Sequence, residues 1–188
     1  SWVQTRYSRD SYTLYARALA VTENNAVMHN NMGNLLLRDG YVEQALPHLH
    51  AAVEIQPDYA LALVNLADAT RMAGDLEMAL EYYARALAEA PESAVILNNY
   101  ALALMEADRL EQAQDVLEKA VLADINDPVL RNSLGVVYMQ QGRLRNADEK
   151  FREADEQFRE ALRLWPGYQS ALDNMERLRE LQRRMPLQ

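Results

Sequence analysis

The chain has no cysteine among its 188 residues, so it forms no disulfide and offers no thiolate to a metal. This absence fits an oxidising and a reducing compartment equally well. Long hydrophobic runs are also missing: the apolar stretch 16–21 is far below the roughly 18 residues that a membrane-spanning helix needs. We therefore expect no insertion into a membrane. The six glycines fall at expected helix crossings and turns, which leaves no glycine-rich loop to bind a phosphate group.

What the chain does contain is typical of a soluble protein with a core, because 49% of its residues are apolar and 25% are charged. Its net charge of −9 is unevenly distributed. Residues 54–127 carry 15 acidic and 4 basic side chains, whereas the last 61 residues carry 11 basic and 9 acidic ones. An acidic middle repels a phosphate backbone, which argues against nucleic acid and favours a basic or neutral peptide. The first residue is Ser1 rather than Met, and we expect the chain to be part of a longer protein.

A repeat with a period of 34 residues organises the sequence. Small residues recur at Gly33, Ala67, Ala101 and Gly135, and again at Ala45, Ala79, Ala113 and Ala147. Large ones recur at Leu49, Tyr83, Leu117 and Phe151. Each unit has helical spacing of apolar residues on both sides of a break, expected at Gly40, Gly74, Asp108 and Gly142. Small residues permit two helices to cross closely, and the large ones fill the space beside them.

This pattern resembles the tetratricopeptide repeat, which has a small-large-small signature and a closing proline such as Pro57 or Pro91. The resemblance implies an all-α fold: a right-handed superhelical solenoid of antiparallel helix pairs. It also implies a single domain over 1–188. Its expected parts are a half repeat at 10–25, full repeats at 26–59, 60–93, 94–127 and 128–168, and a capping helix at 169–185. The missing partner of the half repeat either precedes the chain or lies within 1–9.

The fourth repeat contains a tandem duplication of seven residues, because 147–153 and 154–160 are nearly identical. Seven residues add about two helical turns and return the apolar side to within about 20°. We therefore predict one continuous helix from about Asn146 to Leu164. Its extra length is expected to pack on the last helix through Phe158, Leu162, Leu178 and Leu181, with Trp165 nearby.

Catalytic chemistry is not indicated. His48 and His50 are two residues apart and point to different sides of a helix, which argues against a metal site, and His29 occupies a packing position. Carboxylates alternate with arginines at helical spacing, as Glu81 does with Arg85, which is typical of a solvated surface. We predict no cofactor, no metal and no enzyme activity.

Asparagines suggest a binding surface. Asn31, Asn65 and Asn99 keep the 34-residue step, and an amide can both donate to and accept from the main chain of a peptide. In tetratricopeptide arrays similar asparagines line the concave wall, so the resemblance implies a scaffold that holds a peptide or helix of a partner protein there. The alternative is that each asparagine caps or bridges neighbouring helices. The complete set of candidate binding residues is Asn30, Asn31, Val64, Asn65, Asn98, Asn99, Leu102, Met105, Asn132, Val136 and Met139.

Two further functions remain open. Residues 6–25 resemble the junction found in membrane proteins related to glycosyltransferases, which would make the chain an extracytoplasmic accessory domain that presents a polypeptide acceptor. The other is self-association as a homodimer, because a half repeat exposes an apolar edge near Tyr12, Tyr15 and Leu19. Some tetratricopeptide arrays hold the C-terminal carboxylate of a heat-shock chaperone in a clamp of lysine, arginine and asparagine. We do not expect this clamp here, because Asn30, Val95 and Asn99 stand where it needs cations.

Overall fold

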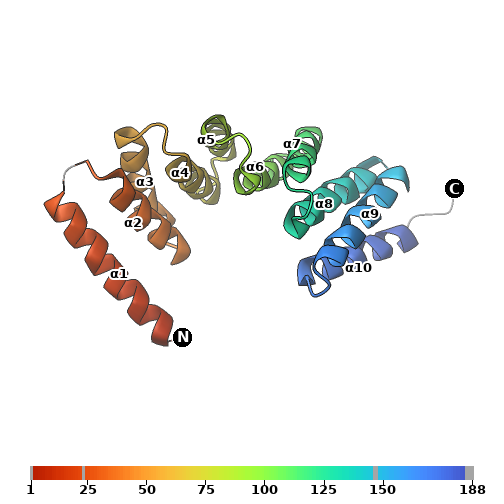
Figure 1. The fold of residues 1–188 in the computed structure, drawn as a ribbon, viewed down its shortest axis with the longest axis horizontal. Helices are drawn as coiled ribbons and strands as arrows, with labels where there is room; N and C mark the ends of the chain where they lie inside the picture. Colours follow the sequence, from red (N-terminus) through yellow and green to blue (C-terminus); the bar gives the residue numbers. More distant parts are fainter. Residues whose placement is uncertain (1, 23, 146–147, 185–188) are drawn as a thin grey trace. The chain divides into compact units, whose positions relative to one another are not determined.

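The computed structural model describes residues 2–22, 24–145 and 148–184, and these residues form ten α-helices and no strand (Figure 1). The predicted all-α class is thereby confirmed. The chain divides into two compact units, Ser1–Pro91 and Glu92–Gln188, which we describe separately.

The first unit contains five helices in which each helix packs against its neighbours in sequence. They are α1 (Trp2–Val21), α2 (Ala26–Arg38), α3 (Val42–Ile55), α4 (Ala60–Met72) and α5 (Leu76–Glu89). Helices α2 and α3 form one hairpin, α4 and α5 form the next, and α2 also contacts α4. Residues 2–9 belong to α1 and do not form a separate helix, which corrects the idea that they supply the missing partner of the half repeat.

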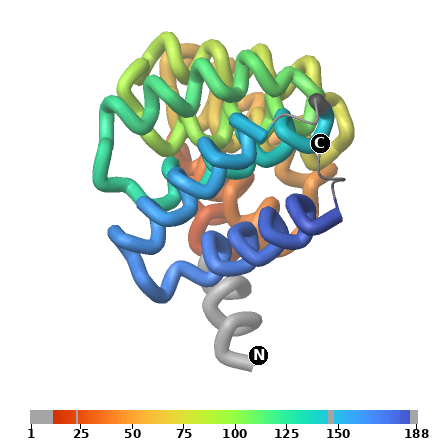
Figure 2. The backbone as a smooth tube through the Cα atoms, turned by 90° about the vertical axis from the view of Figure 1, so that its right-hand side faces the viewer, coloured from red at the N-terminus to blue at the C-terminus, as the bar shows by residue number. Residues whose placement is uncertain are grey.

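The second unit continues the same arrangement with longer helices toward its end. They are α6 (Ala94–Glu106), α7 (Leu110–Ala123), α8 (Pro128–Arg145), α9 (Asp148–Leu164) and α10 (Gln169–Arg184). Helix α8 packs against α7, α9 and α6, and α10 packs against both α9 and α8. Figure 2 shows α10 in dark blue running beside the lighter blue α9.

Local signals in the sequence account for the ends of these helices. The side chains of Asn25, Asp75 and Ser93 each accept a hydrogen bond from the backbone N–H three residues later, which caps α2, α5 and α6. After α2 and α4 the chain turns through Gly40 and Gly74, whose φ angles of 84° and 92° lie in the region that glycine tolerates best. Asp108 takes the same role after α6 at a φ of 58°.

In the first hairpin the small and large residues meet as the 34-residue pattern predicts. A Cβ atom built on Gly33 of α2 would lie 2.5 Å from Cγ of Leu49 in α3, so only glycine permits this contact. Ala45, Leu49 and Ala52 are fully buried beside it. The two helices therefore cross closely because Gly33 in α2 has no side chain and the branched side chain of Leu49 in α3 fills that space.

The fourth hairpin differs from this plan. The predicted break at Gly142 is wrong, because α8 continues through Gly142 to Arg145. Helix α9 is continuous through both copies of the duplicated segment from Asp148 onward, while Asn146 and Ala147 lie outside the described residues. Helix α8 has 18 residues and α9 has 17, against 13 and 14 in α2 and α3. Both helices of the hairpin have therefore lengthened, and not only the second.

The contacts across this hairpin have shifted by one heptad. A Cβ atom on Gly135 would meet the ring of Phe158 at 2.6 Å, and one on Gly142 would meet the ring of Phe151 at 2.9 Å. The 34-residue spacing instead pairs Gly135 with Phe151. Phe158 is the copy of Phe151, and Gly142 matches the turn glycines of earlier repeats, so the duplication created a second crossing of a glycine with a phenylalanine.

The end of the array agrees in part with the predicted packing. Phe158 and Leu178 are buried, as expected for residues between α8, α9 and α10. Leu181 instead lies beside Val136 and Met139 of α8. Trp165 remains half exposed, with its ring stacked on that of Tyr168 at a centroid distance of 4.9 Å.

Candidate docking face

One side of the first helix of each repeat carries the residues that the sequence marks as candidates. The first helices are α2 and α4 in one unit and α6, α8 and α10 in the other. On α2, residues 27, 30, 31, 34, 37 and 38 share a side because each lies three or four positions from another of them. The equivalent side of every first helix, seen within its own unit, is called the first-helix face below.

In the first unit, asparagines on this face bond one another across adjacent helices. The amide of Asn65 in α4 donates to Oδ1 of Asn30 in α2 at 2.7 Å, and the amide of Asn34 donates to Oδ1 of Asn65 at 3.1 Å. Asn30 and Asn65 are nearly closed to solvent. These side chains bridge neighbouring helices, so their hydrogen bonds stabilise the fold whether or not a partner is bound.

The second unit repeats the bridge once and misses it once. The amide of Asn174 in α10 donates to Oδ1 of Asn132 in α8 at 3.0 Å, at the position equivalent to the Asn65–Asn30 bond. Between α6 and α8 the equivalent residues are Asn98 and Ser133. Oδ1 of Asn98 is buried and has no hydrogen-bond partner among the described residues. The shorter serine side chain therefore leaves one amide oxygen unpaired.

The candidate residues separate into closed and open sets. Five are buried: Asn30, Val64, Asn65, Asn132 and Met139. Six are at least partly open to solvent: Asn31, Asn98, Asn99, Leu102, Met105 and Val136. Any partner can reach the second set directly, whereas the first set shapes the helix contacts beneath it.

Exposed apolar side chains also follow this face, and the candidate set omitted most of them. Val27 and Leu61 in the first unit and Val95 and Val129 in the second are 38–67% exposed. They are spaced by 34 residues, at the second position of α2, α4, α6 and α8. The sequence could have revealed them, because an apolar residue recurs at a position where an amphipathic helix normally has a polar one.

Two histidines form a pair within the first unit. Nδ1 of His29 lies 3.1 Å from Nδ1 of His48 between α2 and α3. Burial lowers the pKa of His29, and burial together with the neighbouring His29 lowers the pKa of His48, which favours the neutral forms that can share a hydrogen bond. Spacing on a single helix did not reveal this pair, because the two rings come from different helices.

Two buried tyrosines tie helices together through carboxylates. The hydroxyl of Tyr83 in α5 donates to Asp68 in α4 at 2.5 Å, and that of Tyr138 in α8 donates to Glu118 in α7 at 2.8 Å. Burial and these carboxylates raise the pKa of both tyrosines above the usual value of 10. Asp68 lies on the first-helix face, so its charge is partly engaged in holding α5.

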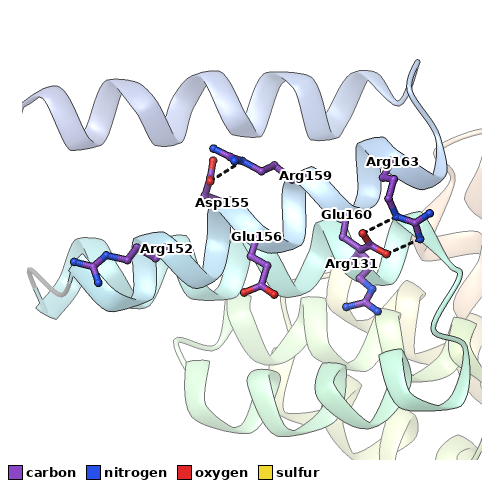
Figure 3. Close-up of a pocket in the computed structure, with 7 residues that line it drawn as sticks. All are labelled: Arg131, Arg152, Asp155, Glu156, Arg159, Glu160 and Arg163. Carbon is purple, nitrogen blue, oxygen red and sulfur yellow. Dashed lines mark hydrogen bonds and ion pairs between the residues drawn. The ribbon is translucent and has the colours of Figure 1, made fainter.

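A cavity of about 670 Å³ beside α9 gathers charged side chains (Figure 3). Its lining residues are Arg131, Arg152, Asp155, Glu156, Arg159, Glu160 and Arg163. Arg159 pairs with Asp155 at 2.8 Å and Arg163 with Glu160 at 2.7 Å. Opposite charges thus compensate one another along α9, as is typical of a solvated helix surface. This surface does not hold a nucleophile or general base away from water.

No cluster of three or more histidine and carboxylate side chains is placed to hold a metal ion within the residues that the structure describes. Among the same residues, no helix combines the length and the apolar composition that crossing a bilayer requires.

Comparison with known proteins identifies the family. Sequence profiles of the tetratricopeptide repeat match residues 23–91 and 70–134. The solved structure of pilF from Pseudomonas aeruginosa is 31% identical, with a TM-score of 0.73, and the alignment covers 84% of this chain and 69% of that one. The chain belongs to the tetratricopeptide repeat family, which confirms the resemblance in its sequence.

Other solved structures share the fold. TTC0263 of Thermus thermophilus, a thermophilic tetratricopeptide repeat protein, has a TM-score of 0.72 at 20% identity over 95% of this chain and 94% of its own. YrrB, described as a tetratricopeptide repeat protein with an unusual peptide-binding site, has a TM-score of 0.63 at 19% identity over 86% of this chain and 97% of its own. A sequence comparison with curated proteins gives no significant match.

Proposed function

We propose that this chain is a non-catalytic interaction scaffold whose first-helix face binds a peptide or helical segment of a partner protein. The observation that carries the proposal is a pair of exposed apolar side chains on the first helices of each unit, Val27 and Leu61 in one and Val95 and Val129 in the other. Each lies beside a partly open amide of Asn31 or Asn99, or beside the bridged asparagines. The peptide-binding site described for YrrB, a protein of the same fold, supports this class of partner.

Typical interaction free energies indicate that the apolar residues contribute most of the binding free energy. A hydrogen bond contributes a net of about 0.5–1.5 kcal/mol, whereas micromolar binding requires about 8 kcal/mol. Asn65 already bonds Asn30 and Asn34, so it has little left to give a partner. Burial of apolar surface at about 25 cal/mol per Å² must supply the remainder, reduced by the cost of ordering the partner. Specificity should therefore reside in these exposed apolar residues.

A selection from a library of random dodecapeptides displayed on phage tests the proposal. Peptides enriched on the full chain are then measured against the variant Leu61→Ser/Val95→Ser. We expect binding to weaken by about tenfold or more, because each half-exposed side chain would lose burial worth about 1 kcal/mol. Both residues are exposed, so circular dichroism and the melting temperature should be nearly unchanged.

The matched control is Met78→Ser/Leu122→Ser. These residues are 39% and 80% exposed and lie on the second helices α5 and α7, outside the first-helix face. Their replacement should leave peptide affinity unchanged. No enrichment at all, or a loss of affinity in the control and not in Leu61→Ser/Val95→Ser, would contradict the proposal.

A further inference from the structure

A small cavity opens on the first-helix face between α8 and α10. Its volume is about 160 Å³ and its lining residues are Val136, Met139, Gln140, Arg143, Arg177 and Leu181. Three of these residues are apolar: Val136, Met139 and Leu181. Two arginines also line it, one from each helix: Arg143 on α8 and Arg177 on α10.

The lengthened hairpin places Arg143 at this cavity. Arg143 follows Val136 by seven residues, so on a continuous helix the two lie within about 20° of each other. In the earlier repeats the equivalent residues, Asp75 and Arg109, lie beyond the first helix and stand at the N-caps of α5 and α7. Only the continuation of α8 through Gly142 adds the turn that carries Arg143 along the first-helix face.

Both arginines are exposed and have no ion-pair or hydrogen-bond partner among the residues that the structure describes. This contrasts with Arg159 and Arg163 on α9, which pair with carboxylates of their own helix. The cavity is thus a cationic site in a chain of net charge −9. An acidic partner is repelled by residues 54–127 but is attracted here.

The size of the cavity limits its occupant. Small-molecule pockets usually measure about 300–1,000 Å³, so this space is too small for a cofactor or metabolite. It suits a single aliphatic or aromatic side chain that projects from a larger partner. The two guanidinium groups can then pair with carboxylates on either side of that side chain, because arginine presents several donors in a fixed plane.

We propose that the cavity between α8 and α10 binds a partner segment in which one large apolar side chain is flanked by aspartate or glutamate. This proposal rests on the proposed function, since it assigns a partner chemistry to one part of the first-helix face. It also gives the seven-residue duplication a role, because the duplication extends α8 and thereby supplies Arg143. Elsewhere on the face, the acidic charge of residues 54–127 favours basic or neutral segments.

The test uses the same dodecapeptide library, selected on the full chain and on the variant Arg143→Gln/Arg177→Gln. Selection on the unchanged chain should enrich acidic peptides that contain Leu, Met or Phe, and the variant should lose that class. Individual acidic peptides should bind the variant about tenfold more weakly, and their affinity for the unchanged chain should fall as salt increases.

Two further variants separate the causes. Arg152→Gln/Arg183→Gln removes the same amount of charge from exposed arginines outside this cavity and should bind acidic peptides normally. Deletion of 154–160 should restore a hairpin of regular length, with Arg143 outside the first helix, and should lose acidic peptides to the same extent as Arg143→Gln/Arg177→Gln.

The outcomes are distinguishable. The absence of an acidic class among the enriched peptides, or acidic peptides that bind equally well to Arg143→Gln/Arg177→Gln, would overturn the assignment of this cavity while the scaffold function stands. Equal loss of binding in Arg152→Gln/Arg183→Gln would show only a general charge effect and would overturn it too. Failure to enrich any peptide would remove the proposed function and this inference together.

Discussion

The hairpin α2–α3 in the first unit and the hairpin α8–α9 in the second are built from the same repeat but turn at different places. In the first, Gly33 meets Leu49 and the chain turns at Gly40 with a positive φ. In the second, the residue equivalent to Gly40 is Gly142, which lies inside α8 and meets Phe151. The same glycine is therefore a turn residue in one hairpin and a crossing point in the other.

The difference shows how a helical hairpin accommodates an insertion. The duplicated segment adds seven residues, and a heptad preserves the buried side of a helix almost unchanged. Leaving the turn at Gly142 would have made α9 protrude by about two turns with Phe158 uncovered. Continuing α8 through Gly142 to Arg145 instead lengthens both helices and covers Phe158 with Gly135 and Phe151 with Gly142. Burial of a second aromatic ring favours this register.

Removing the rings should produce the largest effects. Phe158→Ala and Phe151→Ala should each lower the free energy of unfolding by about 3–5 kcal/mol, since both rings are fully buried. Urea denaturation followed by far-ultraviolet circular dichroism measures this change, with Leu49→Ala as the reference in the regular hairpin. A large loss for Phe151→Ala beside a negligible loss for Phe158→Ala would mean that Gly135 pairs with Phe151 after all.

Adding a side chain to the two equivalent glycines should give a smaller and asymmetric effect. Gly142→Asn should lower the free energy of unfolding by about 1–3 kcal/mol, because its Cβ would meet the ring of Phe151 at 2.9 Å. Gly40→Asn should cost much less, since no atom lies within 4 Å and asparagine tolerates a positive φ. Equal changes in urea denaturation would contradict the different roles of the two residues.

The asparagine bridges provide a third comparison, because Asn65 pairs with Asn30 whereas Asn98 faces Ser133 without a bond. Ser133→Asn should supply the missing donor to Oδ1 of Asn98 and raise the free energy of unfolding by about 0.5–1.5 kcal/mol. Ser133→Leu, which fills similar space without a donor, is the control. If both variants shift the melting temperature alike, packing and not a hydrogen bond is responsible.

The sequence predicted the parts of the fold that depend on local pattern. The spacing of Gly33, Ala67 and Ala101 against Leu49, Tyr83 and Leu117 was sufficient for the helix pairs. It could not place the turn of the fourth hairpin, because Gly142 satisfies both a turn and a close crossing. Which of these two roles Gly142 takes depends on whether Phe158 is buried, and that burial depends on how the two helices of the hairpin pack.

The candidate binding residues show the same limit. The periodicity of Asn31, Asn65 and Asn99 was visible, but it could not reveal that Asn65 is committed to Asn30 across the helix interface. That bond depends on the distance between adjacent first helices. Val27, Leu61 and Val129 recur just as regularly, and their exposure became evident only when the second helices were seen to cover the opposite side.

The conformation of Gly142 tests the account most directly, since both the register of α8–α9 and the position of Arg143 depend on it. Backbone ¹³Cα chemical shifts and the coupling between its amide and α protons report its φ angle, with Gly40 and Gly74 as positive-φ controls in the same spectra. We predict helical values at Gly142, continuous with those of Val137 to Gln141. Values at Gly142 that match those of Gly40 and Gly74 would place the turn there and contradict the shifted register.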